Sequence, residues 1–212
     1  MVTHGFDKEF WERHWRQGPA GGPASMGGNP PNPYLVGEAG GLTPGRALDA
    51  GCGSGAEAIW LASRGWHVTA ADISSEALAR AAERAASSGA SESLRWVEAD
   101  LGVWSPDTRF DLVTTHYAHP AMPQLDFYDR IAGWVAPGGT LLIVGHLHTS
   151  GSTGHGHHQP AEASTTSAAV TARLDSAEWE IVTAEERVRT LTGHGGRTTP
   201  LDDVVVRATR RP

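Results

Sequence analysis

Between residues 46 and 146, short apolar runs alternate with segments in which apolar residues recur every three to four positions. The apolar runs predict strands, and the three-to-four spacing predicts helices. The predicted strands are 46–50, 66–71, 94–99, 110–115 and 139–146, and the predicted helices are 56–64, 75–87 and 124–135. Strands that alternate with helices in this way indicate right-handed crossovers and a parallel sheet with helices on both faces.

The helix expected over 124–135 shows how this packing should work. It places Tyr128, Ile131, Ala132 and Val135 on one face, which makes it amphipathic. We therefore expect it to cover the sheet rather than to stand in solvent.

Both ends of the chain depart from the alternation. A helix is predicted near 6–16, and the Gly- and Pro-rich stretch 17–33 after it should hold no regular structure, as in a linker or lid. Near the other end, apolar segments at 179–188 and 201–209 follow one another with no helical segment between them. The expected fold is α/β, a doubly wound, Rossmann-like, mostly parallel sheet of seven strands that ends in an antiparallel pair.

The length of 212 residues suits one domain. Within residues 1–212, we expect an N-terminal helix and lid or linker over 1–45 and a ligand-binding core over 46–146. A His-rich loop, a helix and an edge hairpin should occupy 147–212.

Charge and composition narrow the classes of function. The formal net charge is −7 with no basic stripe, which argues against nucleic-acid binding. Cys52 is the only cysteine, so an internal disulfide is excluded and a reducing compartment is favoured. No apolar run is long enough to span a bilayer. We expect a cytoplasmic protein, without nucleic-acid or membrane partners, that is a monomer or homodimer.

A glycine-rich loop directly follows the first strand of the core. Gly51, Gly53 and Gly55, with Cys52 among them, allow the backbone to turn tightly and to touch a ligand. In a doubly wound sheet this loop lies at the carboxyl edge, where ligands bind. Asp49 ends the strand, where it would repel a pyrophosphate and attract a cation.

Further acids follow the next two strands. Asp72 ends the second strand and can accept both hydroxyls of a ribose, with Ile73 beside it. Asp100 follows the third strand, where it can accept the amino group of adenine while the Leu101 amide serves a ring nitrogen. Asp49 would face an ammonium and sulfonium end. Together these positions predict a site for S-adenosylmethionine.

At this point the chain resembles the class I S-adenosylmethionine-dependent methyltransferases over about 46–146, with the terminal strand pair in agreement. Asp49-Ala-Gly-Cys-Gly-Ser-Gly55 resembles the first motif of that family, and Pro137-Gly-Gly139 resembles the turn before its fifth strand. Asp72 and Asp100 match its ribose-side and adenine-side acids. Trp11, Trp15 and Pro31-Asn-Pro-Tyr-Leu-Val36 resemble its small-molecule branch, which includes thiopurine and tellurite-resistance methyltransferases. The resemblance implies methyl transfer to a small molecule, a thiol or other soft nucleophile rather than an amine.

Two alternatives remain at this point. The spacing of Gly51, Gly53 and Ala56 also satisfies the dinucleotide fingerprint of an NAD(P)-dependent oxidoreductase, with Asp72 as its ribose acid. A non-catalytic module that senses S-adenosylmethionine or a metal is the other alternative. Asp49 and Asp100 argue against the dinucleotide.

Few catalytic groups are required, because a sulfonium methyl is already activated and the enzyme mainly aligns the reactants. His116, just after the fourth strand, lies where the methyl should point, with Tyr117 and His119 in the same loop. Histidine titrates near neutrality and suits a general base. We name His116, His119 and Tyr117 as candidate catalytic residues.

The candidate substrate-binding residues are Trp11 and Trp15, which could form part of a lid, and His146, which ends the fifth strand. Five histidines lie between 146 and 158 in a loop rich in Gly, Ser and Thr. Without a nearby carboxylate or cysteine, this loop is interpreted as a polar lid, and no metal site is assigned.

Overall fold

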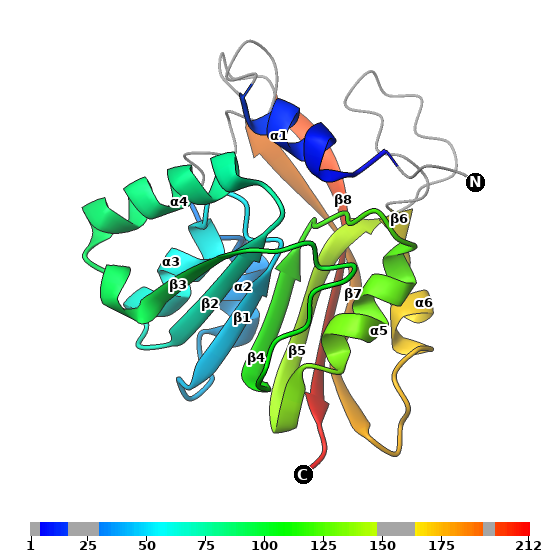
Figure 1. The fold of residues 1–212 in the computed structure, drawn as a ribbon. Coiled ribbons are helices and arrows are strands. Elements are labelled where there is room, and N and C mark those ends of the chain that lie inside the picture. Colours follow the sequence, from blue (N-terminus) through cyan, green and yellow to red (C-terminus); the bar gives the residue numbers. More distant parts are fainter. Residues whose placement is uncertain (1–4, 17–29, 148–163, 193–197) are drawn as a thin grey trace.

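The computed structural model describes residues 5–16, 30–147, 164–192 and 198–212, and Figure 1 traces their path. These residues form one eight-stranded sheet in the order β3-β2-β1-β4-β5-β8-β7, with the short β6 paired to the end of β5. The strands are β1 (Arg46–Ala50), β2 (His67–Asp72), β3 (Leu94–Glu98), β4 (Phe110–His116), β5 (Val135–Leu147), β6 (Ser164–Thr165), β7 (Trp179–Thr192) and β8 (Thr198–Arg210). The expected sheet is confirmed, except that it has eight strands and not seven.

The direction of each strand agrees with the prediction. Strands β1 to β5 pair in parallel, and β8 runs antiparallel to both β5 and β7. The parallel strands therefore bring their carboxyl ends to one edge of the sheet, where α1 lies across them (Figure 1).

Two apolar cores, one on each face, hold helices against the sheet. The helices are α1 (Lys8–Arg16), α2 (Pro33–Ala39), α3 (Ala56–Ser63), α4 (Ser75–Ser88), α5 (Gln124–Ala132) and α6 (Ser167–Thr171), with a 3-10 turn at Ser91–Ser93. Leu35 of α2 and Leu61 of α3 are fully buried in one core, and Phe127 and Ile131 of α5 are fully buried in the other. The helices packed on the two faces of the sheet thus hold in place the loops that follow the parallel strands at their carboxyl ends.

Helix α2 is a correction to the expected linker. Asn32 caps it by accepting a hydrogen bond from the Tyr34 amide at 3.0 Å, and Pro33 occupies its first turn. Asn at the cap and Pro at the first helical position are a known start signal. The high Pro and Gly content upstream hid it. Residues 17–29 lie outside the described residues, so the linker or lid expected there stays a prediction.

The helix expected over 124–135 is also shorter than predicted. Helix α5 ends at Ala132, and Gly133 caps it. Val135, assigned to the apolar face of this helix, instead begins β5 and pairs with Phe110 of β4. Val135 would be buried in the core either as the end of a helix or as the start of a strand, so the apolar pattern alone does not distinguish the two.

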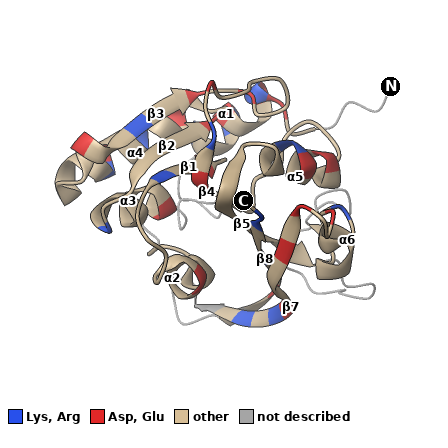
Figure 2. Cartoon of the chain, turned by 90° about the horizontal axis from the view of Figure 1, so that it is seen from below, with Lys and Arg blue, Asp and Glu red and all other residues tan. Residues whose placement is uncertain are grey.

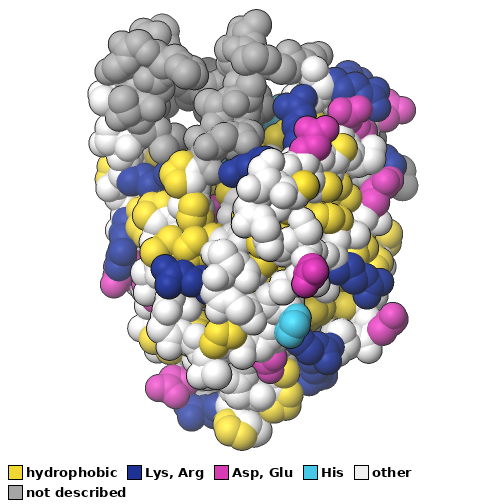
Figure 3. All heavy atoms as spheres, turned by 90° about the vertical axis from the view of Figure 1, so that its left-hand side faces the viewer, with side chains coloured by type: hydrophobic (Ala, Val, Ile, Leu, Met, Phe, Trp, Pro, Cys, Tyr) yellow, Lys and Arg dark blue, Asp and Glu magenta, His cyan; other side chains and the backbone are white. Residues whose placement is uncertain are grey.

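Acidic and basic positions are interspersed along the helices and strands in Figure 2. The face shown in Figure 3 likewise mixes charges of both signs with apolar side chains. Among the described residues, no helix combines the length and the apolar character needed to cross a membrane.

Candidate active site

The glycine loop after β1 has the backbone that the sequence predicts. Gly51, Gly53 and Gly55 have φ angles of 81°, 50° and 76°, a region that side chains disfavour. A Cβ on Gly51 would lie 2.3 Å from the Cβ of Ala118. The loop therefore requires glycine for its conformation, and it lies directly against the segment that follows β4.

Three carboxyl groups surround this loop. Asp49 at the end of β1 is 1% exposed, and its Oδ2 has no hydrogen-bond partner in the part of the chain that the structure describes. Asp72 at the end of β2 accepts hydrogen bonds from the amides of Gly53 at 2.8 Å and Ser74 at 2.9 Å. Glu57, in the first turn of α3, was missed by the sequence analysis. An acid at a helix N-terminus is a usual feature, so only the fold reveals that it approaches the loop.

Burial makes these carboxyls hard to ionise. Burial, with Glu57 and Asp72 as neighbouring charges, raises the pKa of Asp49 well above its usual range. Burial also raises the pKa values of Glu57 and Asp72. An unpartnered buried carboxyl beside a glycine cradle fits a cationic ligand and disfavours a pyrophosphate.

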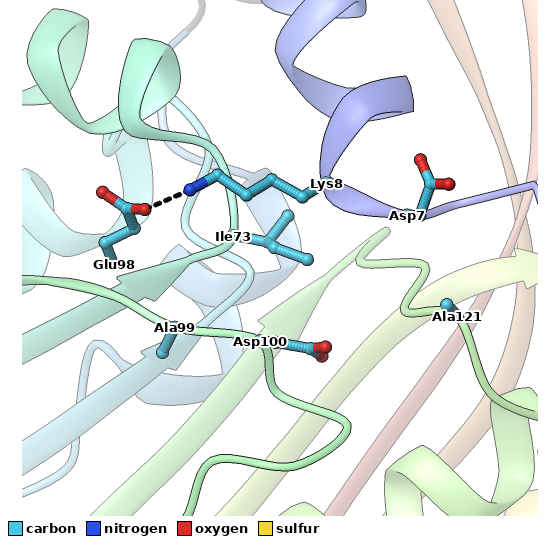
Figure 4. Close-up of a pocket in the computed structure, with 7 residues that line it drawn as sticks. All are labelled: Asp7, Lys8, Ile73, Glu98, Ala99, Asp100 and Ala121. Carbon is cyan, nitrogen blue, oxygen red and sulfur yellow. Dashed lines mark hydrogen bonds and ion pairs between the residues drawn. The ribbon is translucent and has the colours of Figure 1, made fainter.

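A pocket of about 330 Å³ adjoins the ends of β2 and β3. Figure 4 shows the side chains of Ile73 and Asp100 there, together with Ala99 and, from the N-terminal segment, Asp7 and Lys8. Asp100 is exposed and accepts a hydrogen bond from the Gly102 amide at 2.8 Å. The structure thus brings Ile73 and Asp100 together where the adenine was expected, whereas the Leu101 side chain is buried.

Helix α1 lies over this edge. Lys8 forms an ion pair with Glu98 across the pocket (Figure 4). Glu12 accepts hydrogen bonds at 2.9 Å from both the amide and the hydroxyl of Ser75, at the start of α4. The Trp15 ring lies beside the loop, where a Cβ on Gly53 would be 3.1 Å from it. Trp15 therefore faces the predicted cofactor loop, and its part in substrate binding stays a prediction.

The Cys52 thiol donates a weak hydrogen bond to the backbone oxygen of Gly53 in the loop at 3.8 Å. Its side chain is buried in the core on the α3 side of the sheet. Burial, with Asp72 as the next cause, raises the pKa of the thiol well above its usual range. The thiol therefore stays protonated and is a poor nucleophile.

His116 is the last residue of β4, and both of its ring nitrogens are buried without a hydrogen-bond partner among the described residues. Buried polar groups in proteins are normally paired, so an orphan imidazole indicates a missing ligand or water. Burial, with a smaller contribution from Arg189, lowers the pKa of His116 to about 3. The expectation that His116 titrates near neutrality does not hold, because tertiary packing removes the imidazole from water.

A column of rings connects α1 to the ends of β4 and β5. Trp11, Phe6, His119, His146 and Tyr117 succeed one another with centroid distances of 6.0, 5.6, 5.4 and 4.4 Å. The Trp11 indole also donates to the backbone oxygen of His119 at 3.2 Å. The structure therefore brings Trp11 and His146, both predicted to bind substrate, next to the predicted catalytic loop.

His119 and Tyr117 are engaged differently from His116. The Nδ1 of His119 lies 3.2 Å from the side-chain oxygen of Gln124. Tyr117 has a φ of 54°, and its hydroxyl donates to Asp203 at 2.8 Å and accepts from Arg189 at 2.9 Å. These contacts hold both rings in place. The hydroxyl of Tyr117 is thus committed to the network with Asp203, and its part in the reaction stays a prediction.

We predict that His116 and His146 remain neutral well below their ordinary pKa. Burial is the largest cause for each, and the pKa of His146 is also lowered to about 3. The chemical shifts of the imidazole nitrogens, measured by NMR from pH 8 to pH 5, should show that both rings are neutral throughout this range. A midpoint near neutrality for His116 would contradict the buried geometry.

From the sequence, the histidine-rich loop is interpreted as a polar lid without a metal site, and this interpretation stays a prediction. His148, His155, His157 and His158 lie outside the described residues. Within the described ranges, no group of three histidine, cysteine or acidic side chains is arranged to hold a metal ion.

Together, the sheet order, the antiparallel ending and the glycine loop are the features expected of a class I S-adenosylmethionine-dependent methyltransferase domain. Residues 47–139 match the model of a family described as a methyltransferase domain. In the solved structures, TehB from Haemophilus influenzae superposes with a TM-score of 0.68 at 17% identity, over 85% of this chain and 62% of that one. The magnesium protoporphyrin IX methyltransferase ChlM from Synechocystis PCC 6803, solved with bound S-adenosylmethionine, gives a TM-score of 0.58 at 19% identity, over 93% and 79%.

A curated relative supports the same class. The chain is 29% identical over 138 residues to a protein of Arabidopsis thaliana named probable thiol methyltransferase 2, covering 63% of this chain and 60% of the relative. The chain spans less than two thirds of the length of this and the next curated relatives it matches. The cofactor predicted from the sequence, S-adenosylmethionine, is the one that this class uses.

Proposed function

We propose that the protein transfers the methyl group of S-adenosylmethionine to a small thiol or other soft nucleophile. The orphan imidazole of His116 beside the glycine loop is the observation that carries the proposal. It lies at the end of β4, next to the segment that contacts Gly51, and therefore close to the expected position of the methyl group.

Two of the carboxyls around the loop favour this donor over a dinucleotide, whereas Asp72 suits the ribose of either cofactor. Asp49 and Glu57 would face the pyrophosphate of NAD, which carries negative charge. S-adenosylmethionine instead brings a sulfonium and an ammonium group, which these carboxyls attract. When bound, the cofactor supplies an activated methyl group. Asp72 and Asp100 would then hold its ribose and adenine, and Asp49 its amino-acid end.

The environment of His116 bears on the acceptor. An imidazole with a pKa lowered to about 3 is a weak base, and it cannot readily take a proton from an alcohol or an amine. A thiol has an ordinary pKa of about 8.5 and supplies its own nucleophilic thiolate. His116, as a neutral imidazole, would then orient the thiolate sulfur, whose proton has already passed to solvent. The relative named as a thiol methyltransferase agrees with this choice.

Calorimetric titration with S-adenosylhomocysteine, compared with NADH, tests the donor. We expect heat with the former and none with the latter, and no heat from S-adenosylhomocysteine would exclude the proposal. The acceptor is tested by release of S-adenosylhomocysteine from S-adenosylmethionine with a panel of thiols, phenols and heterocyclic amines. Turnover with amines and none with thiols would overturn the acceptor class.

We predict that His116→Ala lowers turnover by about tenfold or more, because the acceptor loses its orienting hydrogen bond. The affinity for S-adenosylhomocysteine should stay within about threefold, since the imidazole is not expected to hold the cofactor tightly. Steady-state kinetics and calorimetry measure the two quantities. His67→Ala, which removes an exposed imidazole at the start of β2, is the matched control. Equal turnover in wild type and His116→Ala would remove His116 from the mechanism.

A further inference from the structure

The Gln124 side chain at the start of α5 is held in one orientation. It is buried, and its nitrogen donates a hydrogen bond to the backbone oxygen of Ala118 at 3.0 Å. A carbonyl oxygen can only accept, so the amide group turns its nitrogen toward Ala118 and its oxygen the other way. The Tyr128 hydroxyl, one turn further along the helix, also bonds to this side chain. The two contacts therefore leave the amide of Gln124 no freedom to flip.

The oxygen of Gln124 determines which nitrogen of His119 carries a proton. This oxygen lies 3.2 Å from Nδ1 of His119. An amide oxygen accepts hydrogen bonds and cannot donate them, so Nδ1 is the protonated nitrogen. In a neutral imidazole, the other nitrogen then has a free lone pair. His119 is thus a proton acceptor at Nε2.

The surroundings of His119 fix the ring and leave this lone pair available. The rings of Phe6 and His146 lie next to it, with centroid distances of 5.6 and 5.4 Å. The Trp11 indole holds its backbone oxygen at 3.2 Å. Within the described ranges, no residue bonds to Nε2, and this atom is not fully buried, in contrast to both ring nitrogens of His116. A proton can therefore enter and leave the ring at Nε2.

We propose that Gln124 is a positioning residue that keeps His119 protonated on Nδ1, and that Nε2 of His119 takes the proton from the acceptor thiol. The inference rests on the proposed function, because it names the group through which the acceptor of that reaction loses its proton. The S–H bond breaks, an N–H bond forms at Nε2, and the electron pair stays on sulfur, which attacks the methyl group as a thiolate. The imidazolium of His119 then gives its proton to solvent.

Gln124 also favours the charged form of the ring. Burial lowers the pKa of His119, and the hydrogen bond to Gln124 acts in the opposite direction. No such contact reaches His116 from the described residues, and its pKa is lowered to about 3. Removing Gln124 would therefore weaken His119 as a base in two ways, because the tautomer is no longer fixed and the imidazolium loses a partner.

Nitrogen NMR of the imidazole rings at pH 8 measures the tautomer without cofactor or acceptor. In the wild type, we expect His119 to carry its proton on Nδ1. Gln124→Met keeps the length of the side chain but removes the acceptor, so most of the ring should change to the form protonated on Nε2. Gln124→Glu keeps an acceptor oxygen and should retain the proton on Nδ1. Asp126→Met, at an exposed position of the same helix, is the control and should match the wild type.

Turnover at pH 8 with two thiols tests the proton transfer itself. 2-Mercaptoethanol is mostly protonated at this pH and needs a base, whereas thiophenol is largely ionised. Gln124→Met should lower turnover of 2-mercaptoethanol by about tenfold or more and that of thiophenol by less than about threefold. Gln124→Glu should restore part of the loss. Equal losses with both thiols that Gln124→Glu does not relieve would show that Gln124 only holds the loop at Ala118.

The outcomes separate the inference from the proposed function. A wild type that methylates neither thiol would overturn the acceptor class, whereas the tautomer of His119 is measured independently of any acceptor. A wild-type His119 that carries its proton on Nε2 would show that the inference is wrong, whatever the turnover. That measurement needs no variant, so it remains decisive even where Gln124→Met is unstable.

Discussion

Asp72→Ala should lower the affinity for S-adenosylhomocysteine by about a hundredfold or more, the largest loss of binding that we expect from one substitution. The Asp72 carboxylate ties the glycine loop to the end of β2 through the Gly53 amide and holds the start of α4 through the Ser74 amide. Removing it loosens the loop and also removes the expected acceptor for the ribose hydroxyls. Calorimetric titration measures the loss.

Two further variants make the Asp72 result specific. Asp72→Asn keeps the shape and one amide acceptor, so we expect an intermediate loss of about tenfold. Asp100→Ala removes an exposed side chain with one hydrogen bond to Gly102, and it should cost about tenfold or less. The melting temperature of each variant shows whether the fold is retained. Affinity within threefold of wild type for a folded Asp72→Ala would show that the ribose is held elsewhere.

The sequence predicted the central sheet well because its signals are local. The parallel strands are short apolar runs, and the first of them is followed directly by a glycine, so β1 at Arg46–Ala50 has the predicted bounds. The glycine loop and the acids that follow β1, β2 and β3 could be placed at one edge, because parallel strands align their carboxyl ends. Helix α2 was missed because its start signal, Asn32 and Pro33, is embedded in a Pro-rich segment.

Properties that depend on distant packing were not predictable. The lowered pKa of His116 follows from the burial of its two ring nitrogens, whereas the sequence supports only the ordinary pKa of histidine. In the sequence, Glu57 is an ordinary acidic residue in the first turn of a helix, where a negative charge is favourable. Only the fold shows that it lies near Asp49. Tyr117 bonds to Arg189, which is 72 positions later in the sequence, and to Asp203, which is 86 positions later. At such separations, a single sequence gives no indication of which side chains are in contact.

That network underlies the largest loss of stability that we expect. Asp203 of β8 is fully buried, and its carboxylate accepts from the Tyr117 hydroxyl at 2.8 Å and from Arg189 at 2.7 Å. The Tyr34 hydroxyl also bonds to Asp203. Asp203→Ala would leave two hydroxyls and a guanidinium without this partner. We expect the free energy of unfolding to fall by about 3 kcal/mol and the melting temperature by roughly 6–12 °C.

Control variants separate the network from a general effect of the substitution. Asp202→Ala changes the adjacent carboxyl, which is not part of the network, and should alter the free energy of unfolding by no more than about 0.5 kcal/mol. Adding Arg189→Met to Asp203→Ala removes the unpaired guanidinium, so the double variant should regain part of the loss. Chemical denaturation of the four proteins measures these differences. A double variant less stable than Asp203→Ala would show that Arg189 stabilises the hairpin through contacts other than Asp203.

The same substitution reaches the candidate active site through Tyr117. This residue has a φ of 54°, which is unfavourable for a tyrosine and is held by the hydroxyl contacts at the far end of the ring. Without Asp203, the residue is free to relax and would carry the stacked His146 and the neighbouring His116 with it. A folded Asp203→Ala protein should therefore lose turnover while keeping its affinity for S-adenosylhomocysteine, because the cofactor loop has its own ties to Asp72. Loss of cofactor affinity with unchanged turnover would show that the hairpin supports the donor side of the site instead.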